Sequence, residues 1–207
     1  MEKFIITRNC YLSKNVNGYF NCYYTGYGNL NNPNYLNVLK NTFNGESYAN
    51  LNNARTQVEN ILIHDIPLIM LENKLTNCVL LCIPRAKALE TYSVNQLCFV
   101  QAVKNAAQRI NGVIDGADYI TRVKNTKTTH LANSNISLAN DGDMPYPGIT
   151  ENTCRIEKNM IKDKTVILVD DIYTRNVNID EDCIQALINA GAKEVLFYAV
   201  AYTRREQ

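Results

Sequence analysis

The sequence predicts an α/β protein with an open, mostly parallel, twisted sheet flanked by helices. Three short apolar runs, "NCVLLCIP" (77–84), "KTVILVD" (164–170) and "EVLFYAVA" (194–201), are typical of strands buried on both faces. Helical segments separate them, and strands that alternate with helices favour parallel pairing with right-handed crossovers. The 207 residues, 46% of them hydrophobic, suit one domain, or one domain with a cap.

The N-terminal part differs from the rest in composition. Residues 9–53 are rich in Asn, Tyr and Gly and carry turn signals such as "NNPN", which predicts an irregular segment with short strands. Residues 54–73 place apolar side chains at helical spacing, and we expect Pro67 to kink or end that helix. The tyrosines could stack on bases, as in single-strand binders, but few basic residues lie among them.

Two elements are expected between the first two apolar runs. Residues 94–110 predict a helix with Ser93 as its N-cap, and "ADYITRV" (117–123) predicts a second strand. The polar stretch 124–160 that follows is too long for a passive connection.

The apolar run at 164–170 leads into a last helix. It is expected over 179–190, with Asn178 as its cap and Gly191 at its end.

Charge and cysteine content narrow the class of protein. The formal net charge is +1, so a nucleic-acid partner would need a local basic patch. The seven cysteines are scattered without a CxxC pair, which indicates reduced thiols and a cytoplasmic protein. No stretch is long and apolar enough to predict a membrane span.

The stretch "VILVDDIYTRNVNID" (166–180) is the strongest functional signal. Asp170 and Asp171 follow a buried strand, and a short polar loop then leads into a helix N-terminus. Ligands of open parallel sheets bind at the carboxyl ends of the strands. Carboxylates can accept hydrogen bonds from vicinal hydroxyls, and free N–H groups before a helix can bind phosphate. The pattern therefore favours a ribose 5-phosphate.

This motif resembles the PRPP-binding motif of type I phosphoribosyltransferases, where PRPP is 5-phosphoribosyl 1-diphosphate. The resemblance assigns Asp170 and Asp171 to the ribose hydroxyls. It assigns the loop to the 5′-phosphate through Thr174, Arg175, Asn176, Val177 and Asn178. Asn176 stands where the family has Gly, and Arg175 and Asn178 stand where it has Thr. Because Asn tolerates positive φ, we expect the loop to close.

Two further segments extend the resemblance. "CIPRAKA" (82–88) lies where the family has its pyrophosphate loop, so Arg85, Ala86 and Lys87 are expected there; a solvated turn is the alternative. "TRVKNTKTTHL" (121–131) begins the stretch where the family has a mobile lid, which brings in Lys124 and Lys127. This segment and "GITENTCRI" are most similar to the competence-associated, ComF-like branch, without its N-terminal Cys-rich zinc segment.

The resemblance implies a phosphoribosyltransferase that transfers the 5-phosphoribosyl group to an unidentified, nitrogenous base and releases pyrophosphate. Mg²⁺ is the implied cofactor, carried by PRPP without direct protein ligands. Residues 76–207 would form the core, and residues 1–75 would form an N-terminal hood that recognises the small-molecule acceptor. The alternatives are a non-catalytic PRPP- or nucleotide-binding regulator, a competence-related protein, or a single-strand binder. A homodimer stays open.

Overall fold

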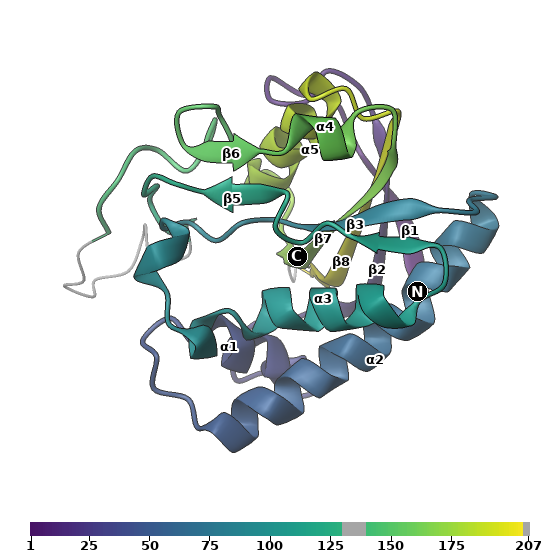
Figure 1. The fold of residues 1–207 in the computed structure, drawn as a ribbon. Coiled ribbons are helices and arrows are strands. Elements are labelled where there is room, and N and C mark those ends of the chain that lie inside the picture. Colours follow the sequence, from purple (N-terminus) through teal and green to yellow (C-terminus); the bar gives the residue numbers. More distant parts are fainter. Residues whose placement is uncertain (130–139, 205–207) are drawn as a thin grey trace.

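A six-stranded sheet forms the centre of the molecule (Figure 1). The computed structural model describes residues 1–129 and 140–204. The strands lie in the order β1 (Glu2–Ile6), β2 (Val16–Tyr24), β8 (Glu194–Thr203), β7 (Thr165–Tyr173), β3 (Cys78–Cys82) and β4 (Val113–Asp115). Only β1 pairs antiparallel with its neighbour, so the predicted α/β class with a mostly parallel sheet is confirmed.

The N-terminal part of the chain belongs to this sheet. The predicted irregular segment contains a nine-residue strand, β2, which pairs in parallel with β8 through partners such as Gly18 and Phe197. At Gly18 an added Cβ would lie 2.6 Å from the ring of Phe4, so a larger residue there would displace that ring. Phe4 can therefore lie over β2 and reach the aromatic side chains of the neighbouring strands.

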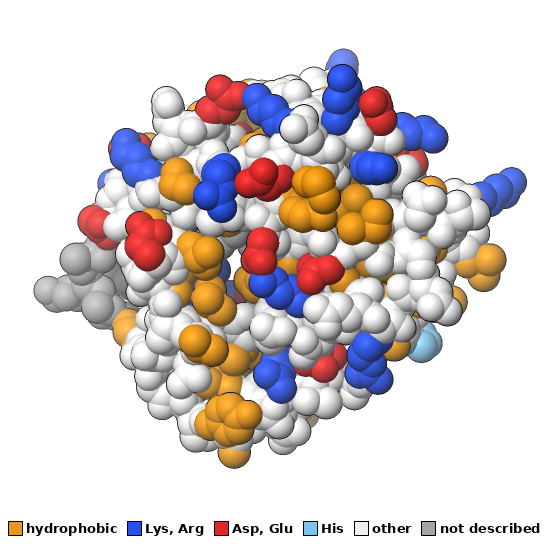
Figure 2. Space-filling model, in the orientation of Figure 1, with side chains coloured by type: hydrophobic (Ala, Val, Ile, Leu, Met, Phe, Trp, Pro, Cys, Tyr) orange, Lys and Arg blue, Asp and Glu red, His pale blue; other side chains and the backbone are white. Residues whose placement is uncertain are grey.

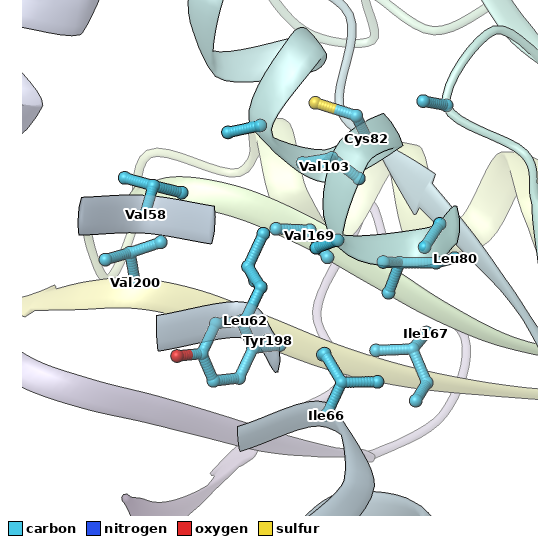
Figure 3. Packing of buried hydrophobic residues seen from close by; sticks show 14 of the residues in the cluster. Val58, Leu62, Ile66, Leu80, Cys82, Val103, Ile167, Val169, Tyr198 and Val200 are labelled. Carbon is cyan, nitrogen blue, oxygen red and sulfur yellow. The ribbon is translucent and has the colours of Figure 1, made fainter. Parts of the chain in front are cut away.

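Three helices, α1 (Asn34–Lys40), α2 (Tyr48–Glu72) and α3 (Cys98–Arg109), cover one face of the sheet (Figure 1). Figure 3 shows apolar side chains of α2 packed against those of the central strands, with Val58, Leu62 and Ile66 facing Ile167, Val169, Tyr198 and Val200. These side chains are almost completely buried. Each contributes about 1.5–3 kcal/mol relative to an exposed position, which fixes α2 on the sheet.

Of the two outcomes expected at Pro67, a kink or an end, the end is wrong, because the helix α2 continues past this residue. It begins after Ser47, whose side chain accepts a hydrogen bond from the Asn50 N–H at 3.2 Å, and it continues to Glu72. Pro67 lies on the exposed side, while Ile66 and Ile69 are buried beside it. Burial of these side chains outweighs the one backbone hydrogen bond that the proline removes.

The opposite face carries α5 (Ile179–Asn189), α4 (Lys158–Ile161) and a second sheet of β5 (Ile120–Arg122) and β6 (Cys154–Ile156). The expectation that 117–123 forms the next strand of the main sheet is wrong. That place is taken by β4, and β5 pairs antiparallel with β6 instead.

The remaining boundaries follow the sequence closely. The expected helix over 94–110 is divided into a 3₁₀ turn, η2 (Val94–Gln96), and α3, with Ser93 and Gln96 forming a capping box. A second 3₁₀ turn, η1 (Leu89–Thr91), precedes it. Among the described residues, no helix combines the length and apolar character that crossing a membrane requires.

Candidate functional site

The acidic pair lies beside the segment that was assigned to pyrophosphate. Strands β3 and β7 are parallel, with Cys82 opposite Val169, so their carboxyl ends reach the same edge of the sheet. The Ile83 N–H then donates a hydrogen bond to the Val169 carbonyl oxygen at 3.0 Å. Since Asp170 is the next residue, the structure brings loop 83–88 close to the acidic pair.

Asp170 and Asp171 do not point the same way. Asp171 Oδ2 lies 4.0 Å from Lys40 Nζ, at the end of α1, and Asp171 Oδ1 accepts a hydrogen bond from the Ile172 N–H at 2.7 Å. Asp170 instead faces Asp180 of α5. Successive side chains of a strand leave on opposite faces, so the two carboxylates have separate surroundings.

The pKa values of Asp170 and Asp180 are both raised. Burial, followed by the charge of Asp171, raises the pKa of Asp170 to about 7. Asp180 is 3% exposed, and burial together with the charge of Asp170 raises its pKa well above the usual range. Two like charges this close in a poorly solvated place cannot both ionise easily.

Two residues of loop 174–178 have a left-handed backbone. Asn176 and Asn178 have φ values of 70° and 66°. The expectation that Asn176 tolerates positive φ is confirmed. The Val177 N–H donates to the Thr174 carbonyl oxygen at 3.1 Å, which closes the turn. Arg175 and Asn176 are exposed.

Two side chains of this loop are held by other segments. The Thr174 and Thr203 hydroxyl oxygens lie 2.6 Å apart. Asn178 occupies the cap position of α5 without a capping hydrogen bond from its side chain. Its Oδ1 accepts from Asn9 Nδ2 at 2.9 Å, and its Nδ2 donates to the Asn176 carbonyl oxygen at 3.2 Å.

Arg85 has its guanidinium engaged by the protein. It donates to the carbonyl oxygens of Gln96 and Lys40, both at 2.6 Å, and its Cζ lies 4.6 Å from the ring centroid of Tyr92. The Arg85 carbonyl oxygen accepts from Arg122 Nε at 2.8 Å. These contacts hold loop 83–88 in place and use donors that a pyrophosphate would need.

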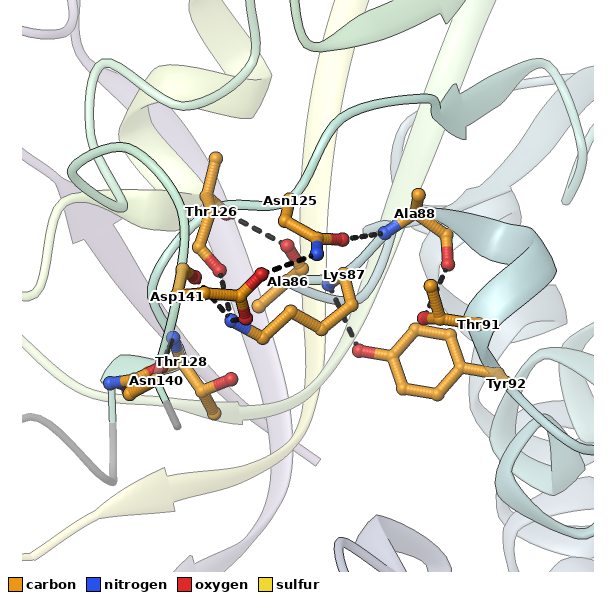
Figure 4. A network of polar contacts seen from close by, with 10 residues as sticks. All are labelled: Ala86, Lys87, Ala88, Thr91, Tyr92, Asn125, Thr126, Thr128, Asn140 and Asp141. Carbon is orange, nitrogen blue, oxygen red and sulfur yellow. Dashed lines mark hydrogen bonds and ion pairs between the residues drawn. The ribbon is translucent and has the colours of Figure 1, made fainter. Parts of the chain in front are cut away.

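Lys87 joins loop 83–88 to the segment predicted as a lid (Figure 4). Its ammonium donates to the Thr126 carbonyl oxygen at 3.0 Å and lies 3.0 Å from Asp141 Oδ1. Asn125 reinforces this contact, because its Nδ2 donates to Asp141 Oδ2 at 2.8 Å and its Oδ1 accepts from the Ala88 N–H at 2.9 Å.

The neighbouring backbone adds to the same network. The Ala86 carbonyl oxygen accepts hydrogen bonds from the N–H and the hydroxyl of Thr126, at 2.8 and 3.0 Å.

The other two predicted lid residues lie at the surface. Lys124 Nζ pairs with Asp143 Oδ2 at 2.9 Å, and both side chains are exposed. Lys127 is exposed, and its backbone N–H donates to the Asp143 carbonyl oxygen at 2.8 Å. Residues 130–139 of the predicted lid lie outside the described residues.

Several neighbours of the site were not singled out from the sequence: Lys40, Arg122, Asp141 and Asp180. Arg122 is 4% exposed and also donates to the Gly148 carbonyl oxygen at 2.6 Å. The position of Arg122 between apolar residues in "YITRV" is a weak signal that its guanidinium is buried and bonded to the backbone. The other three come close only through the tertiary fold, so no local pattern marks them.

The charges on the surface are mixed, and no metal cluster stands out. Figure 2 shows Lys and Arg side chains interspersed with Asp and Glu side chains on the face seen in Figure 1. Within 1–129 and 140–204, no group of three or more His, Cys, Asp or Glu side chains could hold a metal ion. Comparison of the chain with protein-family models and with curated proteins gives no match.

Proposed function

We propose that the protein is a Mg²⁺-dependent phosphoribosyltransferase with a type I phosphoribosyltransferase-like fold. The observation that carries this proposal is the hydrogen bond between the Ile83 N–H and the Val169 carbonyl oxygen. This hydrogen bond joins loop 83–88, which is assigned to pyrophosphate, to the residue before Asp170. The strand that carries Asp170 continues into loop 174–178. A ribose 5-phosphate with a C1 pyrophosphate would need these three parts in this order along one sheet edge.

Each part has a role in this proposal. The half-buried Asp171 accepts hydrogen bonds from ribose hydroxyls, and Asp170 does so once it is ionised. The left-handed turn at Asn176 and Asn178 leaves backbone N–H groups of the loop for the 5′-phosphate.

Mg²⁺ would arrive with PRPP and neutralise charge on the leaving group. It keeps several water ligands when it binds phosphates, so Asp171 would contact it through water and not directly.

The acceptor would bind between the acidic pair and the N-terminal part of the chain. Lys40 is the last residue of α1, and its Nζ lies 4.0 Å from Asp171 Oδ2. Residues 1–75 therefore reach the part of the proposed site where the ribose would bind. This contact supports a hood role for that range in recognition of a nitrogenous base.

A second candidate function follows from the state of the two basic residues. Arg85 donates to two carbonyl oxygens, and Lys87 is paired with Asp141. Cations that are already engaged stabilise a departing pyrophosphate poorly. This favours, as the alternative, a regulator that binds PRPP or a nucleotide without catalysis.

Titration calorimetry of PRPP with and without Mg²⁺ tests both candidates. The variants are Asp171→Asn and the double variant Asp170→Asn/Asp171→Asn, and exposed Asp163→Asn is the matched control. We expect Mg²⁺-dependent binding that the double variant loses and the control keeps. Pyrophosphate release on addition of bases then identifies the enzyme, and binding without release identifies the regulator. Absence of PRPP binding by the wild type overturns both.

A further inference from the structure

A separate pocket of about 300 Å³ lies between the N-terminal segment and the start of α5. It is at the lower end of the size range of small-molecule sites. Its walls include a buried carboxylate, two arginines and three aromatic rings: Glu181, Arg8, Arg175, Phe4, Tyr173 and Tyr202. Neither Asp170 nor Asp171 lines it.

Glu181 offers an unused acceptor in this pocket. The residue is 3% exposed, and its Oε1 accepts a hydrogen bond from the Tyr173 hydroxyl at 3.0 Å. Its Oε2 is buried and has no hydrogen-bond partner within the described part of the chain. Leaving a buried carboxylate oxygen unpaired is costly. A ligand N–H or O–H group would remove that cost.

The Tyr173 hydroxyl stays protonated. Burial and the nearby Glu181 carboxylate raise the pKa of Tyr173 far above its usual value, and its O–H donates to Glu181 Oε1. Glu181 Oε2 is the carboxylate oxygen that has no donor within the described part of the chain.

Two guanidinium groups at the same pocket are unoccupied. Arg8 and Arg175 are exposed, and the side chain of neither makes a hydrogen bond or an ion pair with residues 1–129 or 140–204. Arg85 and Arg122, by contrast, are engaged by carbonyl oxygens. Guanidinium groups bind phosphate through paired, charge-assisted hydrogen bonds. Two free ones lining one pocket favour an anionic ligand.

The aromatic wall is compact. The ring centroid of Phe4 lies 4.9 Å from that of Tyr173 and 5.0 Å from that of Tyr202, and the two tyrosine rings are 5.3 Å apart.

We propose that this pocket binds a small phosphorylated ligand that carries an N–H or O–H donor. The phosphate lies at Arg8 and Arg175, and the donor reaches Glu181 Oε2.

The chemistry fits both a nucleoside monophosphate and a sugar phosphate. This site goes beyond the proposed function, because it depends on Glu181 and Arg8 and on neither member of the acidic pair. Arg175 and Asn176 line this pocket and also belong to loop 174–178, so the two sites share these two residues.

Titration calorimetry with AMP, ribose 5-phosphate and inorganic phosphate tests the assignment. It uses the wild type, the Asp170→Asn/Asp171→Asn variant, Arg8→Ala and Glu181→Gln. Lys14→Ala, an exposed cation of the same segment outside the pocket, is the matched control. Circular dichroism of each variant verifies its fold. Because Arg8 is exposed, Arg8→Ala decides the outcome if Glu181→Gln fails to fold.

We expect AMP or ribose 5-phosphate to bind the wild type and the acidic-pair variant equally, which separates this site from the PRPP site. Arg8→Ala and Glu181→Gln should each weaken that binding about tenfold or more, and Lys14→Ala should leave it unchanged. Tighter binding of AMP identifies a nucleotide, and equal binding identifies a sugar phosphate. The assignment is overturned if neither ligand binds, if inorganic phosphate binds as tightly, or if Arg8→Ala binds like the wild type.

Discussion

Lys87 Nζ and Asp141 Oδ1 lie 3.0 Å apart, which joins loop 83–88 to a residue far along the chain. Hydrogen bonds from Asn125 and Lys87 lower the pKa of Asp141, so the carboxylate is ionised in neutral solution. A ligand that needs the Lys87 ammonium must therefore compete with an anion of the protein itself.

Replacing Asp141 should strengthen pyrophosphate binding. An ion pair with an exposed carboxylate is weak, so Asp141→Asn should lower the Kd of pyrophosphate by up to about fivefold. Asp143→Asn is the control, because Asp143 pairs with Lys124 and its side chain is equally exposed, at 61%. Calorimetry measures both. Weaker pyrophosphate binding by Asp141→Asn would contradict the competition.

Stability should depend on pH through Asp170. Its pKa in the folded state is about 7, above the usual value of 3.8. Between these values the folded protein binds more protons than the unfolded chain, so the free energy of unfolding falls as the pH rises from about 4 to about 7. Asp170→Asn should flatten this decrease in urea titrations. Glu194→Gln, an exposed substitution, should keep the slope of the wild type; an unchanged slope in Asp170→Asn would argue against the shift.

Loop 174–178 should tolerate Gly at position 176 and not Ala. Asn176 has a φ of 70°, a conformation that costs an ordinary L-residue about 1–2 kcal/mol. Asn176→Ala should lower the free energy of unfolding by about 1 kcal/mol, and Asn176→Gly should change it by a few tenths or less. Urea unfolding compares the two. Equal stabilities would mean that the loop relaxes to another backbone conformation.

Removing the proline inside α2 should stabilise the protein. Pro67 is exposed and lies inside a helix that continues to Glu72. Pro67→Ala restores a backbone donor and should raise the free energy of unfolding by about 1–3 kcal/mol. Leu68→Ala at the next exposed position should change it by about 0.5 kcal/mol or less. A decrease for Pro67→Ala would show that the helix is shaped around the proline.

The strands of the central sheet could be predicted where burial on both faces leaves a continuous apolar run, as in β3, β7 and β8. The strand β4 could not be predicted, because Val113–Asp115 is short and only partly buried. The stretch "ADYITRV" was predicted as the strand in its place. The strand β2 was obscured by its Asn and Tyr residues. The helix α2 continued past Pro67 because tertiary burial outweighs local propensity.

The candidate site shows the same limit. The contiguous motif predicted the strand, the left-handed loop and the following helix, since each depends on local backbone preference. It did not predict that Asp170 faces Asp180, or that Lys87 pairs with Asp141. The Lys87–Asp141 pair joins segments that are distant in sequence. Asp170 and Asp180 lie in the same stretch, but whether they face each other depends on how α5 packs on the sheet, which the motif alone does not show.

The parallel pairing of β2 with β8 has a consequence for synthesis of the chain on the ribosome. In the strand order β1-β2-β8-β7-β3-β4, β8 is the strand that joins the N-terminal pair to the other three. Until β8 emerges, one edge of β2 and one edge of β7 present unpaired backbone groups to other chains. Between the synthesis of β7 and that of β8, the nascent protein therefore holds two incomplete half-sheets, and both open edges are paired when β8 inserts between them.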